Sequence, residues 1–274
     1  MTVREIAASL SAAGIESAFH EALLLCERFT GESGAVLRAS LDKPLPESLL
    51  LTAAVEKRCR RYPLQYIFGE WDFMGLPFAV SENCLIPRSD TEILCEYIIK
   101  HAPQKSKLLD LCTGSGCILA SVLHYRKDMT GTAVELYPET LCMAEENFFR
   151  LGVSDRIRAI LGDATTDLLG DDENFDVISA NPPYVTAEEM ETLEPELAAE
   201  PAHALTDGGD GLSILKAIID CYIPHLSEGG FMILEHGASQ SSAVLCYAEA
   251  KGLSAHPLKD YGGNTRAAVI RKEI

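Results

Sequence analysis

The sequence predicts an α/β protein in which a small helical region precedes a mostly parallel, doubly wound sheet. From about Asp90 onward, short apolar segments alternate with segments of helical periodicity, and such βαβ alternation is typical of a parallel sheet with helices on both faces. The first seventy residues, by contrast, show only helical spacing, interrupted by Pro44, Pro46 and Pro63. Between these regions lies a segment of paired aromatic and aliphatic residues around glycines, which indicates a hairpin.

The N-terminal region is predicted to consist of helices with recognisable ends. Thr2 and Glu5 have capping-box spacing for a first helix. The segment 15–31 places apolar residues at helical intervals and stops at Gly31, a typical C-terminal residue. A further helix is expected to have Pro46 in its first turn. Its end, EKRCRRY at 56–62, is the densest basic patch and is expected to be a solvated face that suits the helix dipole.

The remaining elements follow the same alternation. The hairpin is expected within 68–90, and helices are expected over 116–126 and 138–152. The acidic segment 170–174 is expected to be a solvated loop. The strand candidates are 107–111, 131–136, 157–162, 175–180, 231–236 and 266–271. Ligands of such a sheet are expected at the carboxyl ends of its strands.

Composition limits the class of protein. The chain has 274 residues, is 47% hydrophobic and 23% charged, and lacks a long uncharged apolar run, so we expect no membrane span. Its nine cysteines are scattered singly and its N-terminus lacks a signal-peptide pattern, which favours a cytoplasmic protein with reduced thiols and no metal site. The net charge of −18 argues against direct binding of long nucleic acid.

A glycine-containing loop follows the first strand of the sheet and indicates a nucleotide-type cofactor. Asp110 ends the strand, and Gly114 and Gly116 open the next helix, where backbone amides can approach a ligand. Glu135 ends the next strand, where a carboxylate can accept hydrogen bonds from ribose hydroxyls. A dinucleotide fingerprint would need a third glycine at Leu119, so a dehydrogenase is excluded.

The loop instead resembles that of S-adenosylmethionine-dependent methyltransferases, whose cofactor has a ribose but no pyrophosphate. Asp163 follows the third strand and is expected either to receive the adenine amino group or to cap the local backbone.

The segment NPPY follows the fourth strand of the sheet and indicates an acceptor site for a planar NH2 group. Pro182 and Pro183 lack amide donors and stiffen the chain as it leaves the sheet. The side-chain oxygen of Asn181 and the carbonyl of Pro182 can accept both N–H groups of one amide or aromatic amine, and Tyr184 can cover its flat face. Such a clamp would hold a weak nitrogen nucleophile against a methyl donor, without a metal or a strong base. It does not choose between an amide and an exocyclic base amine.

On these motifs the chain resembles the PrmC/HemK family, the peptide chain release factor N5-glutamine methyltransferases. The resemblance covers about Arg60 to Lys272 and is carried by RRYPLQYIFGEWDFMGLPFAV, LIPRSDTE, DLCTGSGC, NPPYV, DGGDGL, GGFMILEHG and DYGGNTRAAVIRK. It implies a Rossmann-like, seven-stranded class I S-adenosylmethionine-dependent methyltransferase domain at 87–274. It also implies a helical substrate-docking domain at 1–68 and a β-hairpin linker at 69–86.

The resemblance further implies the reaction and the site residues. The expected substrate is the glutamine of the Gly-Gly-Gln loop in class I release factors, methylated on its side-chain nitrogen. The expected catalytic residues are Asn181, Pro182 and Tyr184, and these bind the substrate together with Pro183. The expected cofactor-binding residues are Asp110, Cys112, Thr113, Gly114, Ser115, Gly116, Glu135, Asp163, Ala164 and Asn181.

Three positions depart from the family pattern. Cys112 stands where the family often has glycine, and Ala164 stands where an aromatic residue is common. The tail GGNTR lacks an Arg-Asp pair, so Arg266 is assigned a structural role only. The segments Asp90–Glu92 and Asp207–Leu212 are expected to start helices, the second near the substrate.

Three alternative functions share the motifs. A glutamine methyltransferase acting on a ribosomal protein would differ only in its docking surface. A nucleic-acid adenine-N6 or guanine-N2 methyltransferase would need to flip a base and hold a phosphate backbone, which the net charge of −18 disfavours. A cofactor-binding regulator with a degenerate site is disfavoured by the complete NPPY segment.

Overall fold

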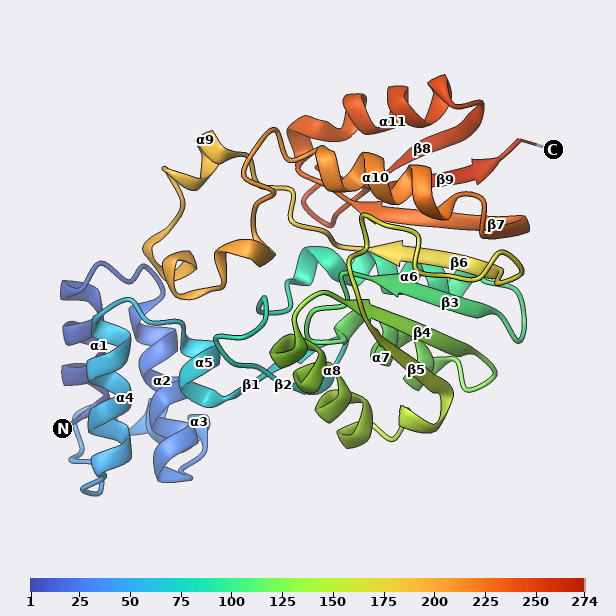
Figure 1. Cartoon of the computed structure of the whole chain (residues 1–274). Coiled ribbons are helices and arrows are strands. Elements are labelled where there is room, and N and C mark those ends of the chain that lie inside the picture. Colours follow the sequence, from blue (N-terminus) through green and yellow to red (C-terminus); the bar gives the residue numbers. More distant parts are fainter. Residues whose placement is uncertain (274) are drawn as a thin grey trace. The chain divides into compact units, whose positions relative to one another are not determined.

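The computed structural model describes residues 1–273, which divide into two compact units (Figure 1). The first comprises Met1–Glu70 with Glu194–Ala199, and the second comprises Trp71–Leu193 with Glu200–Ile274. The helices of the first unit are α1 (Val3–Ala12), α2 (Ala18–Thr30), α3 (Gly34–Ala39), α4 (Leu49–Cys59) and α5 (Leu64–Phe68).

The ends of the N-terminal helices follow local chemistry. Thr2 and Glu5 form the predicted capping box at α1, and Gly31 ends α2 in the left-handed conformation. The prediction for Pro46 was wrong, because α4 begins only after Ser48, whose side chain accepts a hydrogen bond from the Leu51 amide. A side-chain cap at Ser48 thus sets the start of this helix.

One residue of the expected solvated patch is buried. Arg58, in the last turn of α4, is 5% exposed and donates to Glu21 at 2.5 Å and to Glu196 at 2.9 Å. Arg61 donates to the second oxygen of Glu196 at 2.8 Å. The expectation of a wholly solvated face was therefore wrong for Arg58, whose two carboxylate partners compensate the burial of its charge.

The second unit is built on a seven-stranded sheet in the order β5-β4-β3-β6-β7-β9-β8. The pairs β5-β4, β4-β3, β3-β6 and β6-β7 are parallel, while β9 runs antiparallel to both β7 and β8. The strands are β3 (Lys107–Leu111), β4 (Thr130–Glu135), β5 (Ile157–Leu161), β6 (Phe175–Ala180), β7 (Leu226–Glu235), β8 (Leu253–Lys259) and β9 (Thr265–Lys272). This sheet confirms the predicted fold class, and β8 is the strand that the sequence analysis missed.

Helices cover both faces of the sheet (Figure 1). One face carries α6 (Glu92–His101), α7 (Cys117–Tyr125) and α8 (Pro138–Arg150), and the other carries α10 (Ser213–Tyr222) and α11 (Ser241–Ala250). Neighbouring strand residues therefore enter different cores: Leu108 packs with the α6–α8 cluster, and Leu109 packs with the α10–α11 cluster. The short α9 (Ala187–Met190) lies in the segment after β6.

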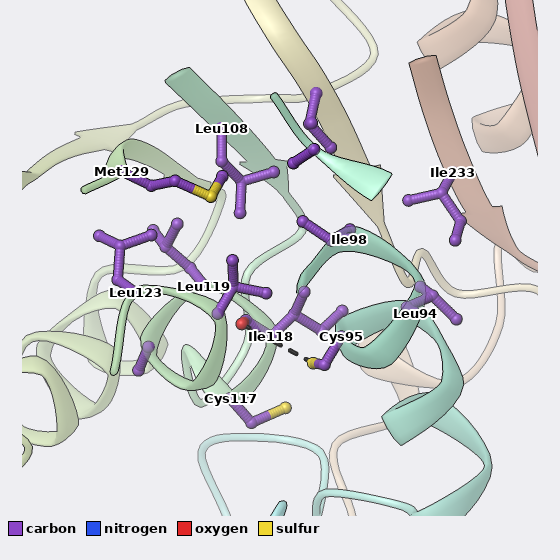
Figure 2. Close-up of a cluster of buried hydrophobic side chains, with 14 of the residues drawn as sticks. Leu94, Cys95, Ile98, Leu108, Cys117, Ile118, Leu119, Leu123, Met129 and Ile233 are labelled. Carbon is purple, nitrogen blue, oxygen red and sulfur yellow. Dashed lines mark hydrogen bonds between the residues drawn. The ribbon is translucent and has the colours of Figure 1, made fainter. Parts of the chain in front are cut away.

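Figure 2 shows the core under α6 and α7, where Leu94 and Ile98 of α6 and Ile118, Leu119 and Leu123 of α7 lie among Leu108, Met129 and Ile233. The thiol of Cys95 donates to the Ile118 carbonyl across the two helices. The burial of these side chains fixes α7, and with it the loop that precedes its first turn.

The predicted hairpin consists of β1 (Glu70–Phe73) and β2 (Leu76–Ala79). Its two turn residues, Met74 and Gly75, both have positive φ, at 53° and 71°, as a two-residue hairpin turn requires. Phe73 and Phe78 pack edge to face in the α6–α8 core.

Candidate active site

A pocket lies in the second unit where the strand order reverses, at the carboxyl ends of β3, β4, β5 and β6. The switch point between β3 and β6 is where open α/β sheets bind their ligands. Nine of the residues that line the pocket were predicted from the sequence to belong to the site: Cys112, Thr113, Gly114, Ser115, Glu135, Asp163, Ala164, Asn181 and Pro183. Cys117, the last residue of the motif DLCTGSGC, lines it as well. The cofactor loop and the NPPY segment therefore face the same cavity.

The loop between β3 and α7 is held by hydrogen bonds within the loop and by hydrogen bonds to β4 and β6. Asp110, at the end of β3, is fully buried and accepts from the hydroxyls of Thr113 at 2.6 Å and Ser179 at 2.7 Å. The Thr113 amide donates to the Val134 carbonyl at 3.1 Å, and the Thr113 carbonyl accepts from the Gly116 amide at 2.8 Å. The loop therefore closes as a tight turn against β4.

The glycines of this loop are required by conformation and by close packing. Gly114 and Gly116 have φ of 56° and 77°, a region that favours glycine. A Cβ at Gly116 would also lie 2.4 Å from the ring of Phe148. Cys112 has φ of 54° as well, which explains why a glycine suits this position and shows that the cysteine is strained there.

Two carboxylates flank the loop. Glu135 accepts from the Gly114 amide at 3.0 Å and from the amides of Leu136 and Tyr137 at 2.9 and 3.1 Å. Glu135 thus orders both the glycine loop and the turn after β4, while it lines the pocket. Burial raises the pKa of Asp110 to about 6, against the hydrogen bonds from Thr113 and Ser179, and the charge of Glu135 adds to the increase.

Asp163 lies beyond the end of β5 and also lines the pocket. Its Oδ1 accepts from both the amide and the hydroxyl of Thr165, at 2.8 and 2.7 Å. The capping role that the sequence left open is therefore present, and the carboxylate still faces the pocket beside Ala164, which is 5% exposed.

The NPPY segment leaves β6 and is held by residues that are distant in the sequence. The Asn181 side-chain amide donates to the Thr91 hydroxyl at 3.3 Å. The Tyr184 hydroxyl donates to Glu235 at 3.0 Å, and the Tyr184 carbonyl accepts from Gln240 at 2.7 Å. Both ends of Tyr184 are thus fixed.

The loop Asp207–Leu212 packs against the same segment. Asp207 accepts from the amides of Gly209 and Gly211 and from the backbone and hydroxyl of Ser213, at the start of α10. A Cβ at Gly211 would lie 2.0 Å from the Tyr184 carbonyl oxygen. The expected loop and helix start are present, and Gly211 allows the loop to approach NPPY.

Buried charges lie behind Tyr184. Glu235, at the end of β7, is 1% exposed, and burial raises its pKa to about 7, against contributions from Thr91, Tyr184 and Arg266. Burial, followed by the charge of Glu235, raises the pKa of Tyr184, so the phenol stays protonated near neutral pH. Arg266 pairs with Asp90 at 3.0 Å. Asp90 therefore forms an ion pair with Arg266, in addition to placing a negative charge at the start of α6.

Four predicted site residues do not line the pocket: Asp110, Gly116, Pro182 and Tyr184. Asp110 and Gly116 lie beneath the glycine loop and shape it. Pro182 is buried and Tyr184 is half-buried beside the lining residues Asn181 and Pro183.

Several residues that support the site were missed by the sequence analysis. Asn147 of α8 is fully buried, donates to the Ser115 and Ala79 carbonyls and accepts from the Ala79 amide. The rings of Tyr137 and His203 stack 3.7 Å apart, and both residues line the pocket. An asparagine within a helical pattern was a signal for Asn147, since this residue favours caps and turns. His203 carried no such signal.

The segment Asp90–Glu92 was expected to cap and start a helix, and Thr91 does stand at the N-cap of α6, but its side chain makes no capping bond there. It is 2% exposed and lies under Asn181. Within residues 1–273, no group of three or more His, Cys, Asp or Glu side chains is placed to hold a metal ion. None of the described helices combines the length and apolar character that a membrane crossing requires.

Comparison with known proteins gives two family matches. The PrmC N-terminal domain matches residues 2–69, and the methyltransferase small domain matches residues 88–222. A release factor glutamine methyltransferase of Cereibacter sphaeroides is 38% identical over 266 residues, covering 96% of this chain and 94% of the relative. That of Salmonella typhimurium is 34% identical, covering 93% of each chain.

Solved structures share the fold at lower identity. A methyltransferase from Pyrococcus furiosus has a TM-score of 0.52 at 18% identity and covers 72% of this chain and 89% of its own. A ribosomal protein L11 methylase from Lactobacillus delbrueckii subsp. bulgaricus has a TM-score of 0.51 at 21% identity, covering 71% of this chain and 84% of its own. At these identities the likeness concerns the fold alone.

Proposed function

The chain belongs to the release factor glutamine methyltransferase family, and on that premise we propose that it methylates the side-chain amide nitrogen of glutamine in the Gly-Gly-Gln loop of class I release factors. The observation that carries the proposal is the position of Asn181. Asn181 directly follows β6 and lines the same pocket as the glycine loop after β3 and the residues Glu135 and Asp163. An acceptor clamp and a cofactor site therefore share one cavity.

The pocket fits S-adenosylmethionine in its chemistry. The Glu135 and Asp163 carboxylates are acceptors, suited to the ribose hydroxyls and the adenine amino group. Gly114 lets the backbone approach a ligand without a side chain, and Val134, Ile118 and Ala164 supply apolar walls. We assign the cofactor to Asp110, Cys112, Thr113, Gly114, Ser115, Gly116, Glu135, Asp163, Ala164 and Asn181, with Asp110 and Gly116 acting through the shape of the loop.

The residues of NPPY would prepare the acceptor nitrogen. When bound, S-adenosylmethionine supplies a methyl group on a sulfonium sulfur as the electrophile. The Asn181 side-chain oxygen and the Pro182 carbonyl would accept the two N–H groups of the glutamine amide and hold its nitrogen in line with that methyl. Transfer would form an N–C bond at the amide nitrogen that Asn181 and Pro182 hold, at the expense of the C–S bond of the methyl donor, whose electron pair would stay on sulfur. The two acceptors stabilise the positive charge that grows on nitrogen, which then loses one proton to solvent.

Tyr184 and Pro183 would complete this side of the site. Tyr184 is held at its hydroxyl and its carbonyl, so its ring is preset to cover the flat face of an amide and exclude water. Pro183 lines the pocket, and its ring fixes φ and so stiffens the segment that carries the Pro182 carbonyl.

We also propose that residues 1–68 form a docking domain for the protein substrate, that 69–86 form the linker and that 87–274 form the catalytic domain. The match of the PrmC N-terminal domain to residues 2–69 supports the first boundary. No disulfide links the nine cysteines, which all lie within residues 1–273, and reduced thiols suit the proposed cytoplasmic location.

The test is methyl transfer from labelled S-adenosylmethionine to parallel acceptors. An intact class I release factor, its Gln-to-Ala loop variant, ribosomal proteins and duplex DNA are each offered to the wild-type enzyme. We expect label on the release factor and none on the loop variant. Label only on ribosomal proteins or only on DNA would overturn the proposed substrate and keep the clamp, since a ribosomal glutamine or an adenine amine fits the same acceptors.

A further inference from the structure

The orientation of the Asn181 amide decides whether the proposed clamp can work. An asparagine side chain carries an acceptor on one side and a donor on the other. Only the orientation that turns Oδ1 toward the substrate nitrogen can accept one of its N–H groups. In the structure, the Asn181 NH2 group donates to the Thr91 hydroxyl at 3.3 Å. The side-chain oxygen Oδ1 is therefore the atom left to accept from the substrate nitrogen.

Thr91 sits where it can impose that orientation. It ends a short helical turn, Ser89–Thr91, that leads into α6, and it is 2% exposed. Its hydroxyl is therefore shielded from water and must use protein partners. Besides Asn181, the hydroxyl acts on Glu235, where hydrogen bonding from Thr91 lowers the pKa of the carboxyl against the effect of burial.

The carboxyl group of Glu235 determines which way the Thr91 hydroxyl donates its hydrogen bond. One carboxylate oxygen accepts from the Tyr184 hydroxyl at 3.0 Å. The other, Oε2, is buried and has no hydrogen-bond partner within residues 1–273. Thr91 already uses its oxygen to accept from Asn181, so its proton needs another acceptor, and Thr91 is also a group that lowers the pKa of Glu235. An ionised carboxylate only accepts hydrogen bonds. The Thr91 proton then points at Glu235, the Thr91 oxygen is left as an acceptor, and Asn181 must present its NH2 group to it.

We propose that Thr91 and Glu235 are positioning residues that fix the side-chain amide of Asn181 with its oxygen toward the acceptor nitrogen. The proposal rests on the proposed function in one respect, that Asn181 receives a planar NH2 group. It gives the segment Asp90–Glu92 a role beyond the start of a helix. It also means that Glu235, at the end of β7, affects the reaction through Asn181, which follows β6. Thr91 lines the pocket but is 2% exposed, and in this scheme it acts through Asn181 rather than on the substrate. Glu235 does not line the pocket.

The arrangement depends on the charge of Glu235. The titratable and charged groups around it are Tyr184 of the NPPY segment, Arg266 of β9, Asp90 before α6 and the adjacent His236. With its pKa raised to about 7, Glu235 gains a proton just below neutral pH. A protonated Glu235 is itself a donor, so Thr91 can turn its own proton toward Asn181. The wild-type kcat is therefore expected to fall as the pH falls through about 7.

The experiment compares Thr91→Val, Thr91→Ser and wild type in methyl transfer under saturating S-adenosylmethionine. Valine keeps the shape and removes the hydroxyl, so kcat is expected to fall about ten-fold or more, the scale of a lost positioning contact. Serine keeps the hydroxyl and is expected to remain within about three-fold of wild type. The affinity for S-adenosylmethionine, measured by calorimetry, is expected to stay unchanged in both variants. Thr132→Val, at a buried threonine of β4 outside the pocket lining, is the matched control.

A second variant tests the charge. Glu235→Gln removes the titrating group and is expected to lower kcat and to abolish the inflection near pH 7 that wild type shows. Wild-type kcat in Thr91→Val, or equal losses in Thr91→Ser and Thr91→Val, would overturn the proposal. If Thr91→Val does not fold, the pH profiles of wild type and Glu235→Gln decide alone, and identical profiles would overturn it. Should wild type label an acceptor other than a release factor, the proposed function fails, and the same variants are compared on that acceptor.

Discussion

Two neighbouring strand ends build the pocket in different ways. The loop after β3 is held partly by its own residues, since Thr113 donates to Asp110 and accepts from the Gly116 amide. It is also held by Glu135 of β4 and Ser179 of β6, whose bonds to the loop span 21 and 69 positions. The NPPY segment after β6 is held by residues that are 51 to 90 positions away in the chain, such as Glu235 and Thr91. Part of the cofactor side is thus a local motif, whereas the contacts that hold the acceptor side form only once the sheet and its helices have assembled. Substitutions on the cofactor side should therefore change mainly the affinity for S-adenosylmethionine, and substitutions on the acceptor side should change mainly kcat.

The largest separation is expected for Asn181→Ala. The substitution removes the acceptor oxygen of the clamp, and the loss of one preorganised polar group of this kind costs about 10²–10³ in kcat. The affinity for S-adenosylmethionine should fall far less than kcat, because Asn181 is only one of the ten residues assigned to the cofactor and the glycine loop keeps its hydrogen bonds. Single-turnover methyl transfer and calorimetry measure the two quantities. Substantial turnover in Asn181→Ala would contradict the clamp, and a loss of cofactor binding would contradict the separation of the two sides.

The next largest effect is expected at Gly211, which supports NPPY from outside. A Cβ there would lie 2.0 Å from the Tyr184 carbonyl oxygen and 2.3 Å from Gln240, so Gly211→Ala must displace the segment. We expect kcat to fall about 10²-fold, as for a misplacement of about 1 Å.

Gly208→Ala is the matched control for this variant. Gly208 has φ of 77°, close to the 70° of Gly211, and beyond its chain neighbours no atom lies within 4 Å of the position that a Cβ would take there. It therefore carries the same backbone strain without the clash. Equal losses of kcat in the two variants would show that strain in the loop, rather than displacement of Tyr184, is responsible.

Each side of the pocket also has a buried carboxyl group, Asp110 at the end of β3 and Glu235 behind the NPPY segment. The ionisation of Asp110 should affect the stability of the protein. The folded pKa of Asp110 is raised from 3.8 to about 6, so the native state binds more protons than the unfolded state between these values. The stabilisation is fully present below pH 3.8 and is lost as the pH rises through about 6. The loss amounts to something on the order of 3 kcal/mol.

Asp110→Asn should therefore flatten the dependence of the free energy of unfolding on pH between about 4 and 6. Urea denaturation at several pH values, without cofactor, measures this slope. Asp171→Asn, which removes an exposed carboxyl group of the acidic loop, is the control. An unchanged slope in Asp110→Asn would contradict the raised pKa.

On the cofactor side, Glu135→Ala is expected to weaken binding of S-adenosylmethionine by about ten-fold or more, since it removes a charged hydrogen-bond acceptor. Part of this loss is indirect, because Glu135 also accepts from the amides of Gly114, Leu136 and Tyr137. Calorimetry measures the affinity, with Glu139→Ala, at an exposed position of α8, as the control. Unchanged affinity in Glu135→Ala would remove the ribose assignment.

The same contrast explains which features the sequence could predict. Asp110, Gly114 and Glu135 lie in short segments with regular spacing to strand ends, so their places followed from the motif. Thr91 and Gln240 reach the site through the fold. Thr91 lies in the segment LIPRSDTE, but the residues there indicated only the start of a helix and not a contact with Asn181. Strand β8 was missed because it is an edge strand with Pro257 in its interior, which an edge tolerates and a central strand does not.

The burial of a charged side chain could not be predicted where its ion-pair partners are distant in the sequence. Arg58 belongs to a basic run that would normally be solvated, yet Glu21 and Glu196 accept its hydrogen bonds. Their separations of 37 and 138 residues give no local signal. Contacts of this kind depend on tertiary structure, as the support of Asn181 and Tyr184 does.

The smallest effect is expected at Cys112, where the local motif of the cofactor side departs from its family. Cys112→Gly would relieve a left-handed conformation at φ of 54°, which costs a residue with a side chain about 1–2 kcal/mol. The variant would also lose the packing of the half-buried Cys112 side chain against its core cluster and gain the larger unfolded-state entropy of glycine, about 0.5–1 kcal/mol. These terms nearly cancel, so the free energy of unfolding should change by less than about 1 kcal/mol. Binding of S-adenosylmethionine should stay equal or become tighter, because the backbone conformation of the loop is kept. A marked loss of affinity in Cys112→Gly would show that the thiol contacts the cofactor, and the cofactor side would then depend on more than its own backbone.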